Sequence, residues 1–237
     1  MAVGGVSVES EESGQSERVP APSSKLAGWL ALVAALATLN YAGRLSNGKP
    51  ESDVLYQYET AVGSVILYAI LLAIVVFGIG RGLPKADFFA LRRPRSWPSA
   101  LGWVLAGYVA IFIGAGLLLL VLDAGEEQGL TPEGWDSSRA GAYAANFVAV
   151  ALVGPVVEEV LYRGAGLSLL LRFGPRIGVV ATAICFGLGH GLVLALPALV
   201  VFGLVTGFVR LRTDSIYPPM LIHCAFNATS LIVAVAT

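Results

Sequence analysis

The stretch from Ala142 to Arg163 reads AYAANFVAVALVGPVVEEVLYR. Residues 142–162 have the length and apolar character of a membrane-spanning helix, because about 20 mainly apolar residues cross a bilayer. Two adjacent glutamates, Glu158 and Glu159, nevertheless lie near its end. An ionisable side chain at membrane depth costs about 2.5–3.5 kcal/mol on insertion scales, and it usually marks a functional site. The stretch therefore predicts a membrane helix that carries such a site.

The composition of the whole chain is typical of a multi-spanning membrane protein. Of its 237 residues, 56% are hydrophobic and only 13% are charged, and the mean hydropathy is +0.76. A soluble domain carries about 25% charged residues. The net charge of -1 gives no basic surface that would indicate nucleic-acid binding. Cys185 and Cys224 both fall in apolar stretches, where we expect small buried side chains rather than a disulfide framework.

Apolar stretches along the chain predict an all-α fold, a polytopic transmembrane helix bundle of about seven spans, with six to eight as the range. Residues 1–24 are rich in Ser, Glu, Gly and Pro and predict a disordered cytoplasmic tail. Residues 25–237 are then the transmembrane helical domain. The predicted spans are 26–43, 62–80, 99–122, 142–162, 177–196, 198–210 and 216–236.

The distribution of Lys and Arg predicts the orientation in the membrane. The loop between the second and third spans is basic, and the next loop is acidic. Because cytoplasmic loops are enriched in Lys and Arg, we expect an integral protein of the plasma membrane with a cytoplasmic N-terminus and an outside C-terminus. Residues 81–98 and 164–176 combine basic and bulky apolar side chains, which indicates either ordinary topology signals or a substrate-docking surface.

The two glutamates are predicted to have different roles. Glu159 and Arg163 are four residues apart, so they share one helix face and can form an ion pair. Glu158 points about 100° away at 3.6 residues per turn. With Arg163 at the membrane interface, Glu158 lies about 7–8 Å below the surface. A buried carboxylate suits a general base, and the alternative is an ion-pair cluster that merely ends the helix.

His190 lies in a second polar motif, Phe186-x-x-x-His190, whose two ends share one helix face. Three glycines, Gly187, Gly189 and Gly191, surround it and allow another backbone to approach closely. The alternative is a histidine that is only hydrogen-bonded inside a tight helix interface.

His223 begins the third motif, His223-x-x-x-Asn227. Imidazole and carboxamide groups supply hydrogen-bond donors for a developing oxyanion. An asparagine in a membrane helix is otherwise most often an interhelical hydrogen-bond group.

The three motifs lie in different apolar stretches and must find polar partners inside the protein, because lipid offers none. We therefore expect them to meet in one cavity open to water. A glutamate, two histidines and an asparagine make a set suited to hydrolysis: Glu158, His190, His223 and Asn227.

The order of these motifs resembles that of the CPBP intramembrane proteases. This family includes the CAAX prenyl endopeptidases and the bacterial abortive-infection proteins. The resemblance covers residues 142–230, whereas the first three spans are generic. It implies that Glu158 and His190 activate the attacking water and that His223 and Asn227 stabilise the oxyanion. The supporting residues that it implies are Glu159 and Arg163, which would brace the site, and Phe186, which would pack beside the catalytic histidine.

Members of this family are described both as metalloproteases and as metal-independent glutamate proteases. The cofactor is therefore either none or zinc. Glu158, His190 and His223 are the candidate zinc ligands, with a fourth position for water. We favour metal-independent chemistry, because Glu158 is then free to act as the base.

The resemblance predicts an intramembrane endopeptidase that hydrolyses a membrane-associated, prenylated or leader-bearing peptide near the cytoplasmic face. Its partners would be a peptide or protein substrate and membrane lipid, with no nucleic acid, and no oligomeric state is indicated. Two alternatives are a proton- or ion-coupled transporter that uses the same ionisable groups, and a non-catalytic immunity or scaffold protein of the same fold.

Overall fold

The computed structural model describes residues 22–47, 53–124, 127, 129, 132 and 134–236. Every regular element within these ranges is helical, so the predicted all-α class is confirmed. The α-helices are α1 (Ser23–Asn47), α2 (Tyr58–Ala73), α3 (Lys85–Phe88), α4 (Trp97–Val121), α5 (Ala140–Val148), α6 (Gly154–Glu159), α7 (Leu167–Leu170), α8 (Pro175–Gly189), α9 (Leu196–Thr213) and α10 (Tyr217–Ala236).

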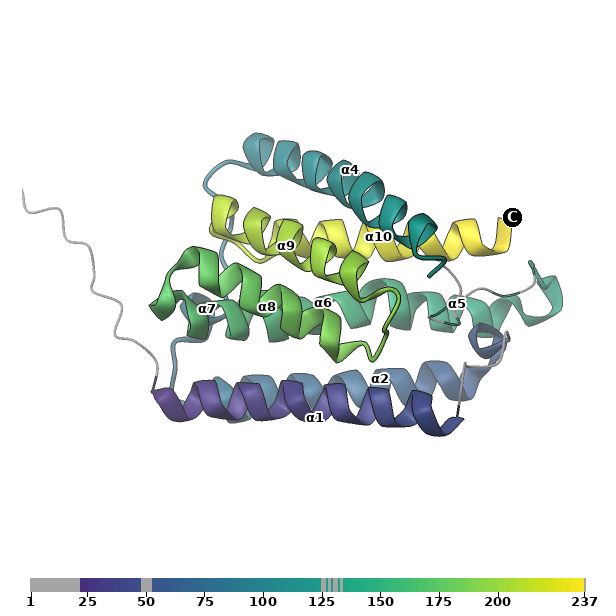
Figure 1. Cartoon of the computed structure of the whole chain (residues 1–237), viewed down its shortest axis with the longest axis horizontal. Helices are drawn as coiled ribbons and strands as arrows, with labels where there is room; N and C mark the ends of the chain where they lie inside the picture. The colour runs from purple at the N-terminus through teal and green to yellow at the C-terminus, as the bar shows by residue number, and fades with distance from the viewer. Residues whose placement is uncertain are drawn as a thin grey trace, which may run out of the picture.

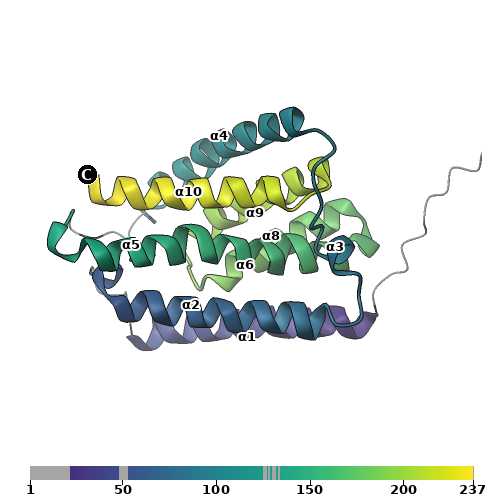
Figure 2. The same ribbon diagram turned by 180° about the vertical axis from the view of Figure 1, so that it is seen from behind.

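The long helices lie roughly parallel in layers (Figures 1 and 2). Helices α1 and α2 form one outer layer, and α5, α6, α7 and α8 lie in the middle of the bundle. Helices α9 and α10 cover the other side of this middle layer, with α4 packed outside them. The middle layer is where the polar motifs gather, because α6 carries the glutamates and α8 ends next to His190.

Within the described residues, six helical stretches are long and apolar enough to cross a membrane, which makes the chain an integral membrane protein. The shorter apolar helix α8 has 15 residues and corresponds to the remaining predicted span, 177–196. In Figure 1 the C-terminus lies at the end of the bundle opposite the start of α1, as an odd number of passes requires. Residues 1–21 of the predicted tail lie outside the described residues, and Ser23 and Ser24 already belong to α1.

Three predicted span limits were wrong. The predicted span 142–162 is part of a continuous helical stretch of 37 residues, Ser137–Phe173. The predicted span 177–196 ends early at Gly189, and the short span 198–210 is the longer helix α9. Glycine has no Cβ and tolerates positive φ, and Gly191 with φ +66° turns the chain between α8 and α9.

The depth predicted for Glu158 was also wrong, because Arg163 is not at a helix end. Glu158 lies 15 residues before Phe173, roughly 20 Å along the helix rather than 7–8 Å. His190 lies 15 residues after Pro175, the first residue of α8. The chain turns at Gly174, between the long helix that carries Glu158 and helix α8. Glu158 and His190 lie about equally far along these two helices from the turn, so they lie at the same level of the bundle.

Two π-helical turns, Ala149–Val153 and Val160–Gly166, flank the glutamates on the long helix. Such turns disturb the α-helical pattern of hydrogen bonds and are frequent at functional sites. Side chains from other helices donate to backbone carbonyls inside both turns. Asn227 Nδ2 donates to the Val150 carbonyl at 3.0 Å, and Trp29 Nε1 donates to the Leu161 carbonyl at 2.9 Å. These contacts tie the glutamate-bearing segment to α10 and α1.

Candidate active site

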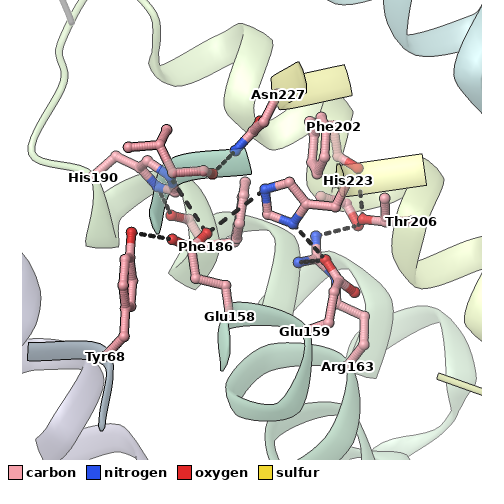
Figure 3. A network of polar contacts seen from close by, with 12 residues as sticks. Tyr68, Glu158, Glu159, Arg163, Phe186, His190, Phe202, Thr206, His223 and Asn227 are labelled. Carbon is pink, nitrogen blue, oxygen red and sulfur yellow. Dashed lines mark hydrogen bonds and ion pairs between the residues drawn. The ribbon is translucent and has the colours of Figure 1, made fainter. Parts of the chain in front are cut away.

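The three predicted polar motifs meet in one cluster (Figure 3). The carboxylate oxygen Glu158 Oε2 lies 3.8 Å from His190 Nε2 and 3.8 Å from His223 Nε2. The Glu158 and His190 side chains are 19% and 20% exposed, whereas that of His223 is 4% exposed. A carboxylate and two imidazoles from three separate helical segments therefore face one another. The cluster is accessible on the side of Glu158 and His190, whose side chains are partly exposed.

Hydrogen bonding fixes the tautomer of neutral His190. Its Nδ1 lies 2.8 Å from the backbone carbonyl of Phe186. A carbonyl oxygen can only accept, so Nδ1 must carry the proton. The Nε2 atom of the neutral ring then presents a lone pair towards Glu158. Because Glu158 Oε2 is buried and accepts no hydrogen bond from the described residues, two acceptor atoms face each other here.

Glu159 forms the second half of the cluster and is fully buried. Its Oε1 accepts hydrogen bonds from Arg163 Nη1 at 2.9 Å and from His223 Nδ1 at 3.0 Å. Arg163 is also fully buried, and it donates from Nη2 to the Gly203 carbonyl at 3.4 Å. The predicted ion pair of Glu159 and Arg163 is confirmed, and it orients His223 as well. The two glutamates have separate contacts, as their positions on the helix predicted.

Phe186 is the apolar centre of the cluster. Its ring packs edge-on against the rings of His190 and His223, at centroid distances of 4.6 and 5.7 Å. The guanidinium of Arg163 lies over the same ring, 4.5 Å from the centroid, in cation–π geometry. Phe202 stacks on Phe186 at 5.4 Å. One aromatic ring therefore holds both imidazoles and the buried cation in place.

Asn227 lies one helical turn after His223 on α10. One N–H of its side-chain amide donates to the Val150 carbonyl. The amide carries a second N–H, so this interhelical contact leaves one donor for another acceptor. The structure thus gives Asn227 a bracing contact, and its predicted oxyanion role stays a prediction.

Tyr68 of α2 is a site residue that the sequence did not reveal. Its hydroxyl donates to Glu158 Oε1 at 3.4 Å. Close approach depends on Gly154, because a Cβ at that position would lie 2.7 Å from the tyrosine oxygen. A tyrosine among the apolar residues of a generic span carries no signal of this contact, although the glycine four residues before Glu158 is the place where a neighbouring side chain can enter.

We also tested the predicted zinc ligands against the geometry. Carboxylate and imidazole are ordinary zinc ligands, and two Nε2 atoms face Glu158 Oε2. However, no group of three or more His, Cys, Asp and Glu side chains in the described part of the chain is arranged to hold a metal ion. No arrangement of Glu158, His190 and His223 that could hold a metal ion is thus found among the described residues. No cofactor and zinc stay the two alternatives, and chelation distinguishes them.

Comparison with known families supports the resemblance inferred from the three polar motifs. The family model of the type II CAAX prenyl endopeptidases, Rce1-like, matches residues 140–229. This range contains all three polar motifs and nearly coincides with the segment 142–230 expected from them. No curated protein and no solved structure matched the chain. Residues 140–229 are therefore similar to the type II CAAX prenyl endopeptidases, and this match supports the resemblance to the CPBP intramembrane proteases.

Proposed function

We propose that the chain is an intramembrane endopeptidase in which Glu158 and His190 activate a water molecule. One observation carries the proposal: Glu158 Oε2 lies 3.8 Å from the Nε2 atoms of both histidines, within a helix bundle. Such a distance is too long for a direct hydrogen bond. At this separation, Glu158 Oε2 and His190 Nε2 can accept hydrogen bonds from the same water molecule.

The chemistry follows from the tautomer of His190. A water molecule between Glu158 Oε2 and His190 Nε2 donates one proton to each, so its lone pairs are directed away towards a peptide carbonyl. Glu158 takes a proton as the water attacks, and the proton is then passed to the leaving amine. General base catalysis of this kind contributes about 10²–10⁴-fold to the rate.

His223 is the proposed oxyanion donor. Because Nδ1 is occupied by Glu159, Nε2 donates only when the ring carries both protons. Glu158 and Glu159 are negative and Arg163 is positive, so a protonated His223 makes the four-residue cluster neutral. The free N–H of Asn227 is the second donor.

The proposed substrate is a peptide that reaches the site from the membrane, with a prenylated C-terminal CAAX sequence as the leading class. The family that matches residues 140–229 is described by that activity. Basic residues occur in the connection between α2 and α4, at the turn between α7 and α8 and in the last turn of α9. In Figure 1 these three segments lie at the end of the bundle where α1 begins. This distribution supports a cytoplasmic N-terminus and an outside C-terminus, and the plasma membrane is the proposed location.

The proposal is tested with purified protein in detergent and two quenched reporter peptides, one with a farnesylated CAAX end and one without the farnesyl group. We expect cleavage of a peptide by the wild type, loss of cleavage in His190→Ala, and faster cleavage of the farnesylated peptide. Cleavage that persists in His190→Ala would contradict the assignment. Incubation with a chelator, followed by added zinc, measures metal dependence, and we expect activity to survive chelation.

The hydrogen bond from Tyr68 to Glu158 leads to a further prediction. Tyr68→Phe removes only the hydroxyl, and hydrogen bonds to charged groups contribute about 1.5–3 kcal/mol, with a long bond at the lower end. We expect kcat to fall about tenfold with little change in KM. Tyr58→Phe, which alters an exposed tyrosine on the same helix, is the matched control. Equal kcat values in the two variants would show that the Tyr68 hydroxyl plays no part.

A further inference from the structure

The loop from Gly189 to Ala195 joins α8 to α9 and carries His190. His190 is the first residue after α8, so no further helical turn fixes its backbone. Helix α1 holds the loop instead. Asn40 Nδ2 donates to the Gly189 carbonyl at 2.6 Å, and the Tyr41 hydroxyl donates to the Leu192 carbonyl at 3.0 Å. The hydrogen bond from Asn40 therefore lies next to His190 in the chain.

Gly191, on the other side of His190, packs directly on α1. A Cβ at Gly191 would lie 2.7 Å from the backbone carbon of Asn40 and 3.0 Å from the nitrogen of Tyr41. The glycine that follows His190 thus allows the backbone contact that its position predicted. Both residues next to His190 are in contact with Asn40.

The far side of the loop is held by Glu127. Its two carboxylate oxygens each accept one backbone hydrogen bond, from Val193 and from Ala195, both at 2.7 Å. Partial burial acts to raise the pKa of the Glu127 carboxyl. The hydrogen bonds from the backbone of residues 193–195 outweigh this effect, with a smaller contribution from Arg44, and hold the pKa below its usual range. Glu127 is therefore ionised at neutral pH and accepts both bonds.

Arg44 joins α1 to Glu127, the two parts of the protein that hold the loop. Its Nη1 donates to the backbone carbonyl of Glu127 at 2.7 Å. The end of α1 thus contacts the loop through Asn40 and contacts Glu127 through Arg44. All of these supporting residues lie before residue 140, outside the segment that the family model matches.

We propose that Asn40 and Glu127 are positioning residues for His190. They hold the loop so that His190 Nε2 stays within reach of the water molecule on Glu158. The inference rests on the proposed function, because it takes His190 as part of the reaction. Displacing a reacting group by about 1 Å can lower a rate by about 10²-fold. A role in catalysis follows for α1 and for the loop that carries Glu127, although neither supplies one of the proposed reacting groups.

The test uses three loop variants and two control variants of the full-length protein in detergent. Asn40→Asp keeps the size of the side chain but removes the donor. Glu127→Gln keeps one acceptor oxygen of two, and Glu127→Ala removes both. Thr38→Ala and Glu59→Gln, at exposed positions of α1 and α2, serve as controls. Thr38→Ala is the control on α1, and Glu59→Gln is the matched loss of a carboxylate. The readouts are kcat and KM for the farnesylated reporter peptide and hydrogen exchange of the Val193 and Ala195 amides.

We expect kcat to fall about 10-fold or more in Asn40→Asp and Glu127→Ala, with KM within about twofold, since misplacement affects the chemical step. Glu127→Gln should lie between Glu127→Ala and the wild type. The Val193 and Ala195 amides should exchange faster in Glu127→Ala, whether or not the reporter is cleaved. If Glu127→Ala does not fold, Glu127→Gln and Asn40→Asp carry the comparison.

Two outcomes would overturn the inference. Faster exchange with a kcat equal to that of the controls would mean that the held loop does not position His190, and the proposed function would stand. Unchanged exchange in Glu127→Ala would mean that Glu127 does not hold the loop at all. Failure of the proposed function would be seen differently, as a wild type that cleaves neither reporter peptide.

Discussion

Glu158→Gln should lower kcat for peptide cleavage by about 10³-fold, the size of a general base contribution. The amide has nearly the same volume as the carboxylate but cannot accept a proton from water at neutral pH. Fold stability should change little, because Glu158 Oε2 accepts no hydrogen bond from the described residues and Oε1 has only the long contact with Tyr68.

The measurement is a kinetic assay of the purified variant together with its thermal unfolding midpoint. Glu59→Gln is the matched control, since it removes an exposed carboxylate from α2. We expect the control to retain wild-type kinetics. A Glu158→Gln variant that keeps more than about a tenth of the wild-type kcat would be incompatible with a base contribution of this size.

Glu159→Gln should instead damage the fold. Glu159 is the partner of Arg163, and both side chains are fully buried. Removing one member of a buried ion pair costs about 3–5 kcal/mol, because the other charge is left without compensation. At about 2–4 °C per kcal/mol for a chain of this size, the unfolding midpoint should fall by roughly 10 °C. Activity should fall as well, since the acceptor of the His223 Nδ1 hydrogen bond loses its negative charge.

Thermal unfolding followed by tryptophan fluorescence measures this effect, because Trp29 packs against Tyr162 close to the cluster. Asp53→Asn is the control, since it breaks the half-exposed ion pair of Arg139 with Asp53. An exposed pair contributes only about 0–1 kcal/mol. If Glu159→Gln unfolds at the same temperature as Asp53→Asn, the structural role of Glu159 is refuted.

The sequence predicted those parts of the site that depend on local spacing. Positions four apart placed Arg163 beside Glu159 and His190 beside Phe186, because a helix brings such residues together. The cost of polar groups in lipid predicted that the glutamates and histidines would meet, and Glu158 lies equally far from both imidazoles.

Span limits and depth could not be predicted in the same way. From the sequence, Arg163 is expected at the membrane interface, because a charged residue usually ends a membrane helix. In the structure Glu159, the Gly203 carbonyl and the Phe186 ring surround Arg163, so the helix continues to Phe173. The charge of Arg163 is compensated by residues up to 40 positions away, and sequence spacing does not report such contacts.

The residues that hold the site in place could not be predicted either, because their contacts are also long-range. Tyr68 and Asn40 belong to helices with no polar motif, and Glu127 lies in a loop that reads as a plain acidic connection. Their contacts with Glu158, Gly189 and the 193–195 backbone span 66 to 149 residues of sequence. The packing of α1 and α2 against the middle layer (Figure 2) allows the contacts of Asn40 and Tyr68, whereas Glu127 comes from the connection between α4 and α5.

The central claim is that Glu158 and His190 act on one water molecule. A double-mutant cycle of Glu158→Gln and His190→Ala, measured as kcat for the reporter peptide, tests it most directly. Residues that act as a unit are strongly non-additive. We therefore expect each single variant to lose about 10³-fold and the double variant to lose no more than about tenfold beyond that. A double variant whose loss equals the product of the two single losses would contradict the account.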